Sequence, residues 1–360
     1  MTTASLATEE TVPTEFSIIE GEYLGDILDQ PRAMQETLKG LEDSDALQHI
    51  AGRLRKAEFR AIVLTGMGSS FHVLHPIHLD LIDYGFVSIM VETSELIHYQ
   101  HRLFDPKTLI VAVSQSGQSA ETVRLLEVNR RRSAVVGITN TADSPLAKEA
   151  DAAIVTRAGK EFSVSCKTYL ASLMGLKWLS DILCSGDLGR SQQELGTAVP
   201  VVGEYLNHWR EHVEAFAQRL KGIRDLFMVG RGASLAAVGT GALTVKESDH
   251  FHAEGMSSAA FRHGPFEMLS DDNFVLVFEG DSKTRDLNVR LLDDIRGQRG
   301  RAELVGEGGD FPPCNLPKVP PSVRPIIEVL PAQMITLALA ALARREAGRF
   351  ERATKITATE

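Results

Sequence analysis

The chain has 360 residues, a length that suits two domains of ordinary size. Its composition, 43% hydrophobic and 24% charged residues, is typical of a globular protein. The formal net charge of −10 argues against a nucleic-acid partner, because no broad basic surface is expected that could displace counterions from phosphates. The three cysteines are far apart and lack metal-ligand spacing, so we expect reduced thiols in a cytoplasmic protein.

Two further observations argue against a membrane protein. The first ten residues are acidic and lack the basic and apolar parts of a signal sequence. The most apolar helical stretch, residues 334–343, is shorter than a membrane span, so we expect it to be a core helix.

After an N-terminal arm of short helices, with breaks at Pro13 and Pro31, strand-like and helix-like segments alternate. Helical apolar spacing occurs at residues 71–84 and 123–128. The predicted strands are residues 61–65, 87–91, 109–113, 134–139 and 152–156. Such alternation predicts a parallel sheet that is covered by helices on both faces.

The same pattern restarts in the second half of the chain. A predicted strand at residues 225–229 ends in the glycine loop 230–234, which mirrors the glycine loop 66–70 at an offset of 164 residues (230 minus 66). The same offset carries Val113 onto Val277, the end of another predicted strand. Two matching strand ends indicate a duplicated unit. We therefore predict an α/β fold of two tandem doubly wound parallel-sheet domains with flavodoxin-like α-β-α layers.

The predicted organisation has five parts. They are an arm over residues 1–45, a first domain over 46–190, a connecting helix within 191–222 (residues 202–219), a second domain over 223–345, and a tail over 346–360. The second domain has Glu279 and Asp281 where the first has hydroxyl side chains, and carboxylates repel phosphate. Only the first domain is therefore expected to bind phosphate.

The most informative segment is residues 114–122, Ser-Gln-Ser-Gly-Gln-Ser-Ala-Glu-Thr, which follows a buried strand and leads into a helix. The free N–H groups of a strand-to-helix turn favour an anion, glycine permits close approach, and hydroxyls donate without adding charge. The segment predicts a phosphate cradle for a small metabolite. The alternative is a serine-rich turn that merely caps the helix.

Carboxylates and imidazoles cluster at residues 246–254 and 262–265. Such groups can transfer protons between adjacent carbons or open a sugar ring. The alternative is a charged helix end facing solvent, which we prefer for Asp249 and His250. A zinc site is not expected, because the histidines of this cluster are not spaced four residues apart on a helix.

Taken together, these motifs resemble the tandem sugar isomerase (SIS) domain family, and most closely the isomerase half of the glutamine–fructose-6-phosphate aminotransferases. The resemblance runs from about Gly25 to the C-terminus. Its markers are residues 66–70, 114–117 with Thr122, 140–151, 164–167, 246–247, 252–254, 263–265 and Lys355.

The resemblance implies a role for each matching residue. Three would be catalytic: Glu247 as the base that moves a proton between C1 and C2, His263 as the ring-opening residue contributed by a neighbouring subunit, and Lys355 as the amine that forms a Schiff base at C2. The tail would then fold over the active site. The implied substrate-binding residues are Gly68, Ser69, Ser114, Gln115, Ser116, Gly117, Thr122, Val164, Ser165 and Glu254.

Departures from the family shape the predicted function. No glutaminase segment or cysteine nucleophile is found after Met1, so glutamine is not expected to be the nitrogen donor, and Thr244, Ala260 and Arg262 replace family residues. We predict a cytoplasmic homodimer that converts glucosamine 6-phosphate, or a close relative, to the ketose phosphate and ammonia without a cofactor. The alternatives are a glutaminase-less synthase-like aminotransferase, a fructosamine-phosphate deglycase and a non-catalytic sugar-phosphate sensor.

Overall fold

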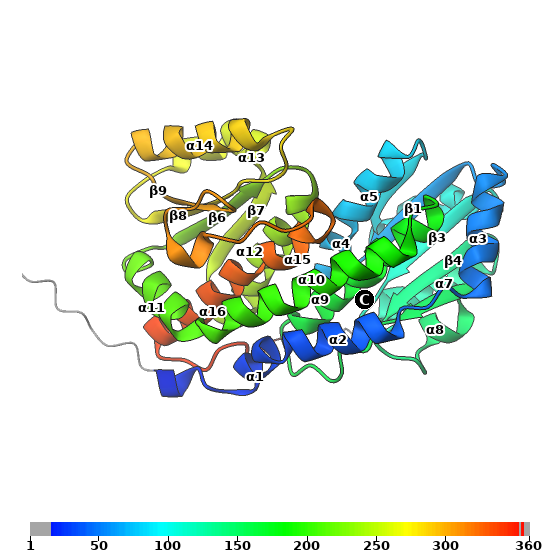
Figure 1. The fold of residues 1–360 in the computed structure, drawn as a ribbon, viewed down its shortest axis with the longest axis horizontal. Coiled ribbons are helices and arrows are strands. Elements are labelled where there is room, and N and C mark those ends of the chain that lie inside the picture. The colour runs from blue at the N-terminus through cyan, green and yellow to red at the C-terminus, as the bar shows by residue number, and fades with distance from the viewer. Residues whose placement is uncertain (1–15, 353, 356–360) are drawn as a thin grey trace, which may run out of the picture.

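A computed structural model describes residues 16–352, 354 and 355. Its described residues form two parallel β-sheets, one toward each end of the elongated molecule (Figure 1). The part of the arm before residue 16, including Pro13, lies outside the described residues. The predicted α/β class with parallel sheets is confirmed.

The first sheet has five strands in the order β2-β1-β3-β4-β5. Their bounds are β1 Ala61–Gly66, β2 Ser88–Glu92, β3 Thr108–Val113, β4 Ala134–Thr139 and β5 Ala152–Val155. Every residue of β1, β3 and β4 is buried. Successive side chains of a strand point to opposite faces, so Leu64 and Val63 belong to different apolar clusters. Burial on both faces explains why these strands are continuous apolar runs.

Helices cover both faces of this sheet. One face packs against α3 (Asp45–Arg55), α5 (Leu74–Asp83) and α9 (Lys167–Leu183), and the other packs against α6 (Thr93–Tyr99), α7 (Ala120–Asn129) and α8 (Pro145–Glu149). The single helix predicted at residues 71–84 is divided at Val73, because α4 (Ser69–His72) forms a separate turn after the glycine loop.

The second sheet has four strands in the order β7-β6-β8-β9, which repeats the order β2-β1-β3-β4. Its strands are β6 Asp225–Gly230, β7 His252–Ser257, β8 Asn273–Phe278 and β9 Arg301–Val305. The pairing of Ala61 with Thr108 corresponds to the pairing of Asp225 with Asn273. One extra residue therefore lies between β6 and β8, and the predicted single offset of 164 becomes 165 at β8.

The described part of the second half contains three longer helices, α12 (Leu235–Asp249), α14 (Arg285–Gly297) and α16 (Leu330–Ala343), and two short ones, α13 (Ser258–Arg262) and α15 (Arg324–Glu328). Short 3-10 turns lie at Gly232–Ser234, Pro265–Met268, Pro312–Cys314 and Pro321–Val323. The structure thus places the His252 and Glu254 pair on an edge strand, to which the sequence had assigned no element.

The apolar stretch near the C-terminus is longer than the sequence suggested. The helical region Pro321–Ala343 has 23 residues and a mean hydropathy of 1.9, so it is long and apolar enough to cross a membrane, and the length argument was wrong. It is nevertheless 89% buried inside the protein, and α16 packs against α11 and α12. The prediction of a core helix is confirmed.

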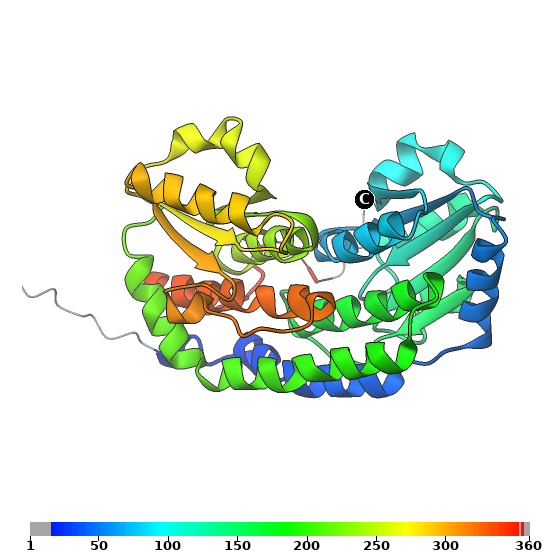
Figure 2. The same cartoon turned by 45° about the horizontal axis from the view of Figure 1, so that its top comes forward.

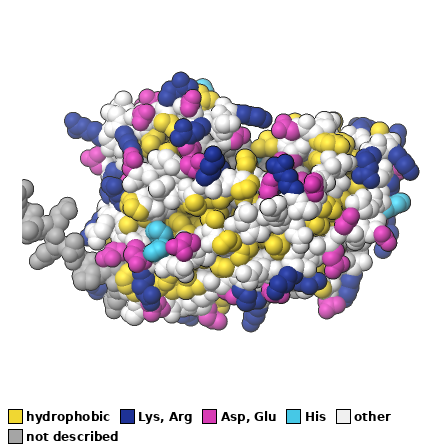
Figure 3. All heavy atoms as spheres, viewed as in Figure 1, with side chains coloured by type: hydrophobic (Ala, Val, Ile, Leu, Met, Phe, Trp, Pro, Cys, Tyr) yellow, Lys and Arg dark blue, Asp and Glu magenta, His cyan; other side chains and the backbone are white. Residues whose placement is uncertain are grey.

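Two helices, rather than one, connect the sheets. The predicted helix 202–219 is the end of α10 (Leu188–Asn207) followed by α11 (Trp209–Arg219), with the break at His208. In Figure 2, α10 runs along the underside of both halves beside the N-terminal helices. The N-terminal helices are η1 (Phe16–Ile18), α1 (Glu22–Leu28) and α2 (Gln30–Gly40). Pro31 lies in the first turn of α2, where proline is tolerated. On the face drawn in Figure 3, cationic and anionic side chains are interspersed.

Candidate active site

A cavity of about 580 Å³ lies at the carboxyl ends of β1 and β3. This is the position at which open parallel sheets bind ligands. The α12 helix and the C-terminal segment complete its wall. The predicted site residues that line it are Gly68, Ser69, Ser114, Gln115, Ser116, Thr122, Ser165, Glu247 and Lys355. Segments almost 300 residues apart in the sequence therefore meet in one cavity.

The hydroxyl groups of the predicted cradle are fixed by the backbone of their own turn. The Ser114 hydroxyl accepts from the Gly117 N–H at 3.1 Å, and the Ser116 hydroxyl accepts from the Gln118 N–H at 3.3 Å. Each hydroxyl still has its own proton to donate. These two donors and the N-terminus of α7 suit a phosphate.

The competing interpretation, a helix cap, is also present in the same turn. Ser119 is the N-cap of α7, and its hydroxyl accepts from the Thr122 N–H and contacts the Thr122 hydroxyl at 2.8 Å. Capping therefore occupies Ser119, while Ser114 and Ser116 lie before the helix begins. The two interpretations apply to different residues of the turn.

Glycines shape both loops at this sheet edge. Gly117 has φ 64°, and an added Cβ would overlap the side chain of Ser144. Gly68 has φ 53° and precedes α4, which starts at Ser69. Both backbone angles lie in the left-handed region that favours glycine. Gly117 thus shapes the cradle from behind and does not itself line the cavity.

Glu247 is the titratable group in the cavity best suited to transfer a proton. Burial raises the pKa of its carboxyl from 4.5 to about 7, although Lys355 and Lys246 oppose this change. A carboxyl with a pKa near neutrality can both accept and return a proton. The predicted base therefore has the protonation behaviour that the chemistry needs.

Lys355 reaches the cavity from the C-terminal segment and is paired with a carboxylate. Its Nζ lies 2.8 Å from Glu161 Oε2 and donates to the Ser163 carbonyl oxygen at 2.8 Å. The Glu161 side chain is fully buried, whereas that of Lys355 is 22% exposed. The sequence had not singled out Glu161, which stands three residues before the marker 164–167.

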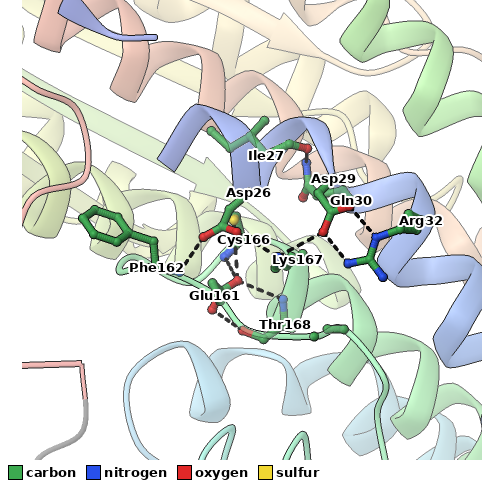
Figure 4. Close-up of polar contacts among 12 residues, drawn as sticks. Asp26, Ile27, Asp29, Gln30, Arg32, Glu161, Phe162, Cys166, Lys167 and Thr168 are labelled. Carbon is green, nitrogen blue, oxygen red and sulfur yellow. Dashed lines mark hydrogen bonds and ion pairs between the residues drawn. The ribbon is translucent and has the colours of Figure 1, made fainter. Parts of the chain in front are cut away.

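The loop that carries Glu161 is held by the N-terminal helices (Figure 4). Asp26 Oδ2 accepts from the Phe162 N–H at 2.5 Å. The buried Lys167 pairs with Asp26 at 2.8 Å and with Asp29 at 3.0 Å. Through these contacts α1 and α2, far from Glu247 and Lys355 in sequence, fix one wall of the cavity.

The C-terminal segment is anchored on the last turn of α12, next to Glu247. The Gly348 N–H donates to the Ser248 hydroxyl at 2.9 Å, and Arg345 donates to the Asp249 carbonyl oxygen at 3.0 Å. His250 Nδ1 lies 3.7 Å from Glu351. Residues 350–352, 354 and 355 then line the cavity. Residues 353 and 356–360 of the predicted tail lie outside the described residues.

We had assigned two residues to a solvent-facing helix end; His250 is exposed there, as expected, and Asp249 is not. His250 lines the cavity, because the left-handed turn at the end of α12 directs the chain back toward it. Asp249 is buried, neither of its carboxylate oxygens has a hydrogen-bond partner, and burial raises its pKa well above the usual range. The helical position of Asp249 did not reveal that the C-terminal segment packs on the end of α12.

Besides Gly117, three predicted site residues are not part of the cavity wall. Val164 is fully buried in the apolar core. Glu254 is exposed on the edge strand β7, where it lies 3.7 Å from His252. His263 is exposed at the end of α13. The cavity is therefore formed without them.

With the geometry established, the chain can be compared with known proteins. Residues 54–179 match the SIS domain family. Glutamine–fructose-6-phosphate aminotransferase of Pyrococcus horikoshii is 29% identical over 334 residues, which cover 89% of this chain and 54% of the relative. The chain thus spans about half the length of the curated relatives it matches.

Solved structures agree on the fold. The C-terminal domain of glucosamine-fructose-6-phosphate aminotransferase from Francisella tularensis superposes with a TM-score of 0.82 at 20% identity, covering 92% of this chain and 98% of that one. Glucosamine-6-phosphate deaminase from Thermotoga maritima superposes with a TM-score of 0.72 at 20% identity, covering 94% of this chain and 100% of that one. At these identities the likeness establishes the fold alone.

The first sheet thus lies within the segment that matches a SIS domain, residues 54–179, and the cavity at its edge is completed by residues outside this segment. The chain as a whole is related to sugar-phosphate isomerases and aminotransferases, through the half of the aminotransferase that it matches.

Proposed function

We propose that this chain is an amino-sugar-phosphate isomerase and deaminase, which converts glucosamine 6-phosphate or a close relative to the ketose phosphate and ammonia. One observation carries the proposal: a single cavity joins the hydroxyl cradle at Ser114 and Ser116 with Glu247, whose pKa is about 7. A cradle for phosphate next to a poised proton carrier suits aldose–ketose chemistry on a sugar phosphate.

The reaction follows from these positions. The phosphate lies in the cradle, which aligns C1 and C2 of the open sugar with Glu247. The Glu247 carboxylate removes the proton from C2 and then returns it to C1. O1 gains a proton and the nitrogen at C2 loses one, so that the aldehyde at C1 becomes an alcohol and the amine at C2 becomes an imine. Water or Lys355 then displaces nitrogen at C2. The relatives support this scheme by their names, because they include both a fructose-6-phosphate aminotransferase and a glucosamine-6-phosphate deaminase.

We also propose that the second sheet, within residues 223–345, is a second SIS domain. Its strand order repeats that of the first sheet, which favours duplication. The carboxylate that we expected to repel phosphate there, Glu279, is buried and paired with Arg285 at 2.5 Å. Its charge therefore serves the fold rather than a ligand.

A homodimer with shared active sites is part of the proposal. His263 is exposed and lies outside the cavity of its own subunit, which suits a ring-opening residue that acts in a neighbour. Mixing equal amounts of a Glu247→Gln variant and a His263→Ala variant should restore about a quarter of wild-type activity, since about half of the dimers are mixed and each mixed dimer has one intact site out of two. Activity that is no higher than that of the separate variants contradicts sharing. A cytoplasmic location remains a prediction.

The test of the function is the release of ammonia and fructose 6-phosphate from glucosamine 6-phosphate. We expect equal amounts of both from the wild type and neither from Glu247→Gln. Release of the aldose phosphate and the amine from a fructosamine phosphate only would favour the deglycase, because a fructosamine carries its nitrogen at C1. Synthesis from ammonia only would favour the aminotransferase, and tight binding without turnover of any of these would favour the sensor.

A further inference from the structure

A second cavity, of about 720 Å³, lies where the two halves of the molecule meet. The loops that follow β6 and β8 form part of its wall, so it lies at the carboxyl ends of the second sheet. Helices α5 and α9 of the first half and α15 of the second half complete it. Open parallel sheets bind ligands at this position, and the first sheet has its own cavity there.

The two cavities have corresponding residues in their walls. The offset of 164 that relates the glycine loops also relates Asp83 to Glu247 (247 minus 83), and each lines its own cavity. The offset of 165 that holds at β8 relates Ser116 to Asp281 (281 minus 116), and each again lines its own cavity. The packing is reciprocal as well, because α12 contacts α4 and α5 contacts the 3-10 turn Gly232–Ser234. The second cavity is thus the counterpart of the first, with a carboxylate in place of a hydroxyl of the cradle.

The two lysines in the described wall of the second cavity are already paired with carboxylates. Lys177 lies 2.5 Å from Asp181 on the next turn of α9. Lys283 lies 3.7 Å from Asp83, which joins a loop of the second half to the end of α5 in the first. These two lysines therefore compensate two of the carboxylates that line the cavity.

Two further carboxylates of the wall are held by neutral donors. Asp80 accepts from the Ser180 hydroxyl at 2.9 Å, and Asp281 accepts from the Lys283 backbone N–H at 2.9 Å. Burial raises the pKa of the neighbouring Glu328 to about 7, and the negative charge of Asp281 adds to this change. Such surroundings favour a positive charge in the cavity and repel a phosphate.

We propose that the second cavity binds an unphosphorylated amino sugar. Its ammonium group would pair with the carboxylates of the wall, and its hydroxyls would donate to them. The less polar face of the sugar ring would lie on the apolar side chains of the wall, which include Leu173, Leu176 and Ile326. The inference goes beyond the proposed function, and it rests on that function only in taking the ligand to be a sugar.

The first test is calorimetric titration with D-glucosamine, compared with N-acetylglucosamine, which keeps the sugar but lacks the positive charge. We expect a dissociation constant of about 1 mM or lower for glucosamine, a strength that a ligand of this size can reach. N-acetylglucosamine should bind about tenfold more weakly, because it loses a hydrogen bond between charged groups. Equal affinities, or no binding of glucosamine up to about 10 mM, overturn the inference.

The second test locates the bound sugar. Asp281→Asn keeps an acceptor oxygen for its own turn, and Asp80→Asn keeps one for Ser180, so both variants should fold and should each weaken glucosamine binding about tenfold. Asp286→Asn is the matched control, because Asp286 is exposed in the first turn of α14 and does not line the cavity. We expect wild-type affinity for glucosamine in this control and in Ser116→Ala.

Binding that Ser116→Ala weakens and that Asp281→Asn leaves unchanged would place glucosamine in the first cavity and overturn the inference. The proposed function is judged separately, by turnover of glucosamine 6-phosphate. If the wild type shows none, the proposed function fails, while the titrations of the two aspartate variants still decide whether the second cavity binds the amino sugar.

Discussion

Replacing Glu247 with glutamine should make the protein more stable above neutral pH while it abolishes activity. Burial raises the pKa of Glu247 from 4.5 to about 7, and the side chain faces a cavity between buried elements. At roughly 1.4 kcal/mol for each tenfold change in proton affinity, this difference corresponds to about 3 kcal/mol. The group holds its proton more tightly in the folded state, so its contribution to stability is complete below pH 4.5 and is lost as the pH rises through 7. Glutamine does not titrate, so the free energy of unfolding of the variant does not fall in this way.

The assay is urea unfolding of both proteins between pH 4.5 and 8. The free energy of unfolding of Glu247→Gln minus that of the wild type should rise by about 3 kcal/mol over this range and then level off. The other carboxyl groups contribute equally to the free energy of unfolding of both proteins, so their contributions cancel in the difference. Glu254→Gln, the same change at an exposed carboxylate, is the control and should show no comparable rise. A flat difference for Glu247→Gln would refute the argument that burial controls this carboxyl.

Three further predictions concern the cavity wall and its support. Ser116→Ala should weaken fructose 6-phosphate binding about tenfold in calorimetry, because a hydrogen bond to a charged phosphate is worth about 1.5–3 kcal/mol; unchanged binding would remove Ser116 from the cradle. Gly117 has φ 64°, and a Cβ at this position would overlap the Ser144 side chain. Gly117→Ala should therefore lower both the thermal midpoint and the ligand affinity, and a variant with wild-type values would contradict the strain argument. Lys167→Met leaves the buried Asp26 without its cation, while Asp29 keeps its pair with Arg32, and should cost about 3–5 kcal/mol in urea unfolding. The exposed-pair control Lys39→Met should cost less than about 1 kcal/mol, and similar losses would refute the burial argument.

The sheets could be predicted because their signals are local. Residues of β1 and β3 are apolar throughout, since both faces of the strands are covered, and each strand ends in a glycine or hydroxyl loop. The divided helices were missed for the opposite reason. The break at His208 between α10 and α11 depends on how two helices pack on different parts of the core, which apolar spacing alone does not show.

Site residues that directly follow a strand could be predicted from the sequence. Site residues whose position depends on tertiary contacts could not. Ser114 and Ser116 follow β3, so their position at the sheet edge was expected. The cavity role of His250 and the burial of Asp249 depend on the C-terminal segment, which packs on them from about 100 residues further along the chain. Glu161 lies in a loop without regular structure, and its burial and its pairing with Lys355 depend on tertiary contacts that the sequence does not show.

The account rests on one claim, that the cradle and Glu247 serve one sugar phosphate in a single cavity. Its most direct test measures two quantities on Glu247→Gln: the dissociation constant for fructose 6-phosphate by calorimetry, and turnover of glucosamine 6-phosphate. We predict binding within about twofold of the wild type and turnover reduced by at least about a hundredfold, since general acid–base groups typically contribute 10²–10⁴ in rate. Unchanged turnover would contradict the claim that Glu247 carries the proton, and binding lost together with turnover would contradict the separation of cradle and base.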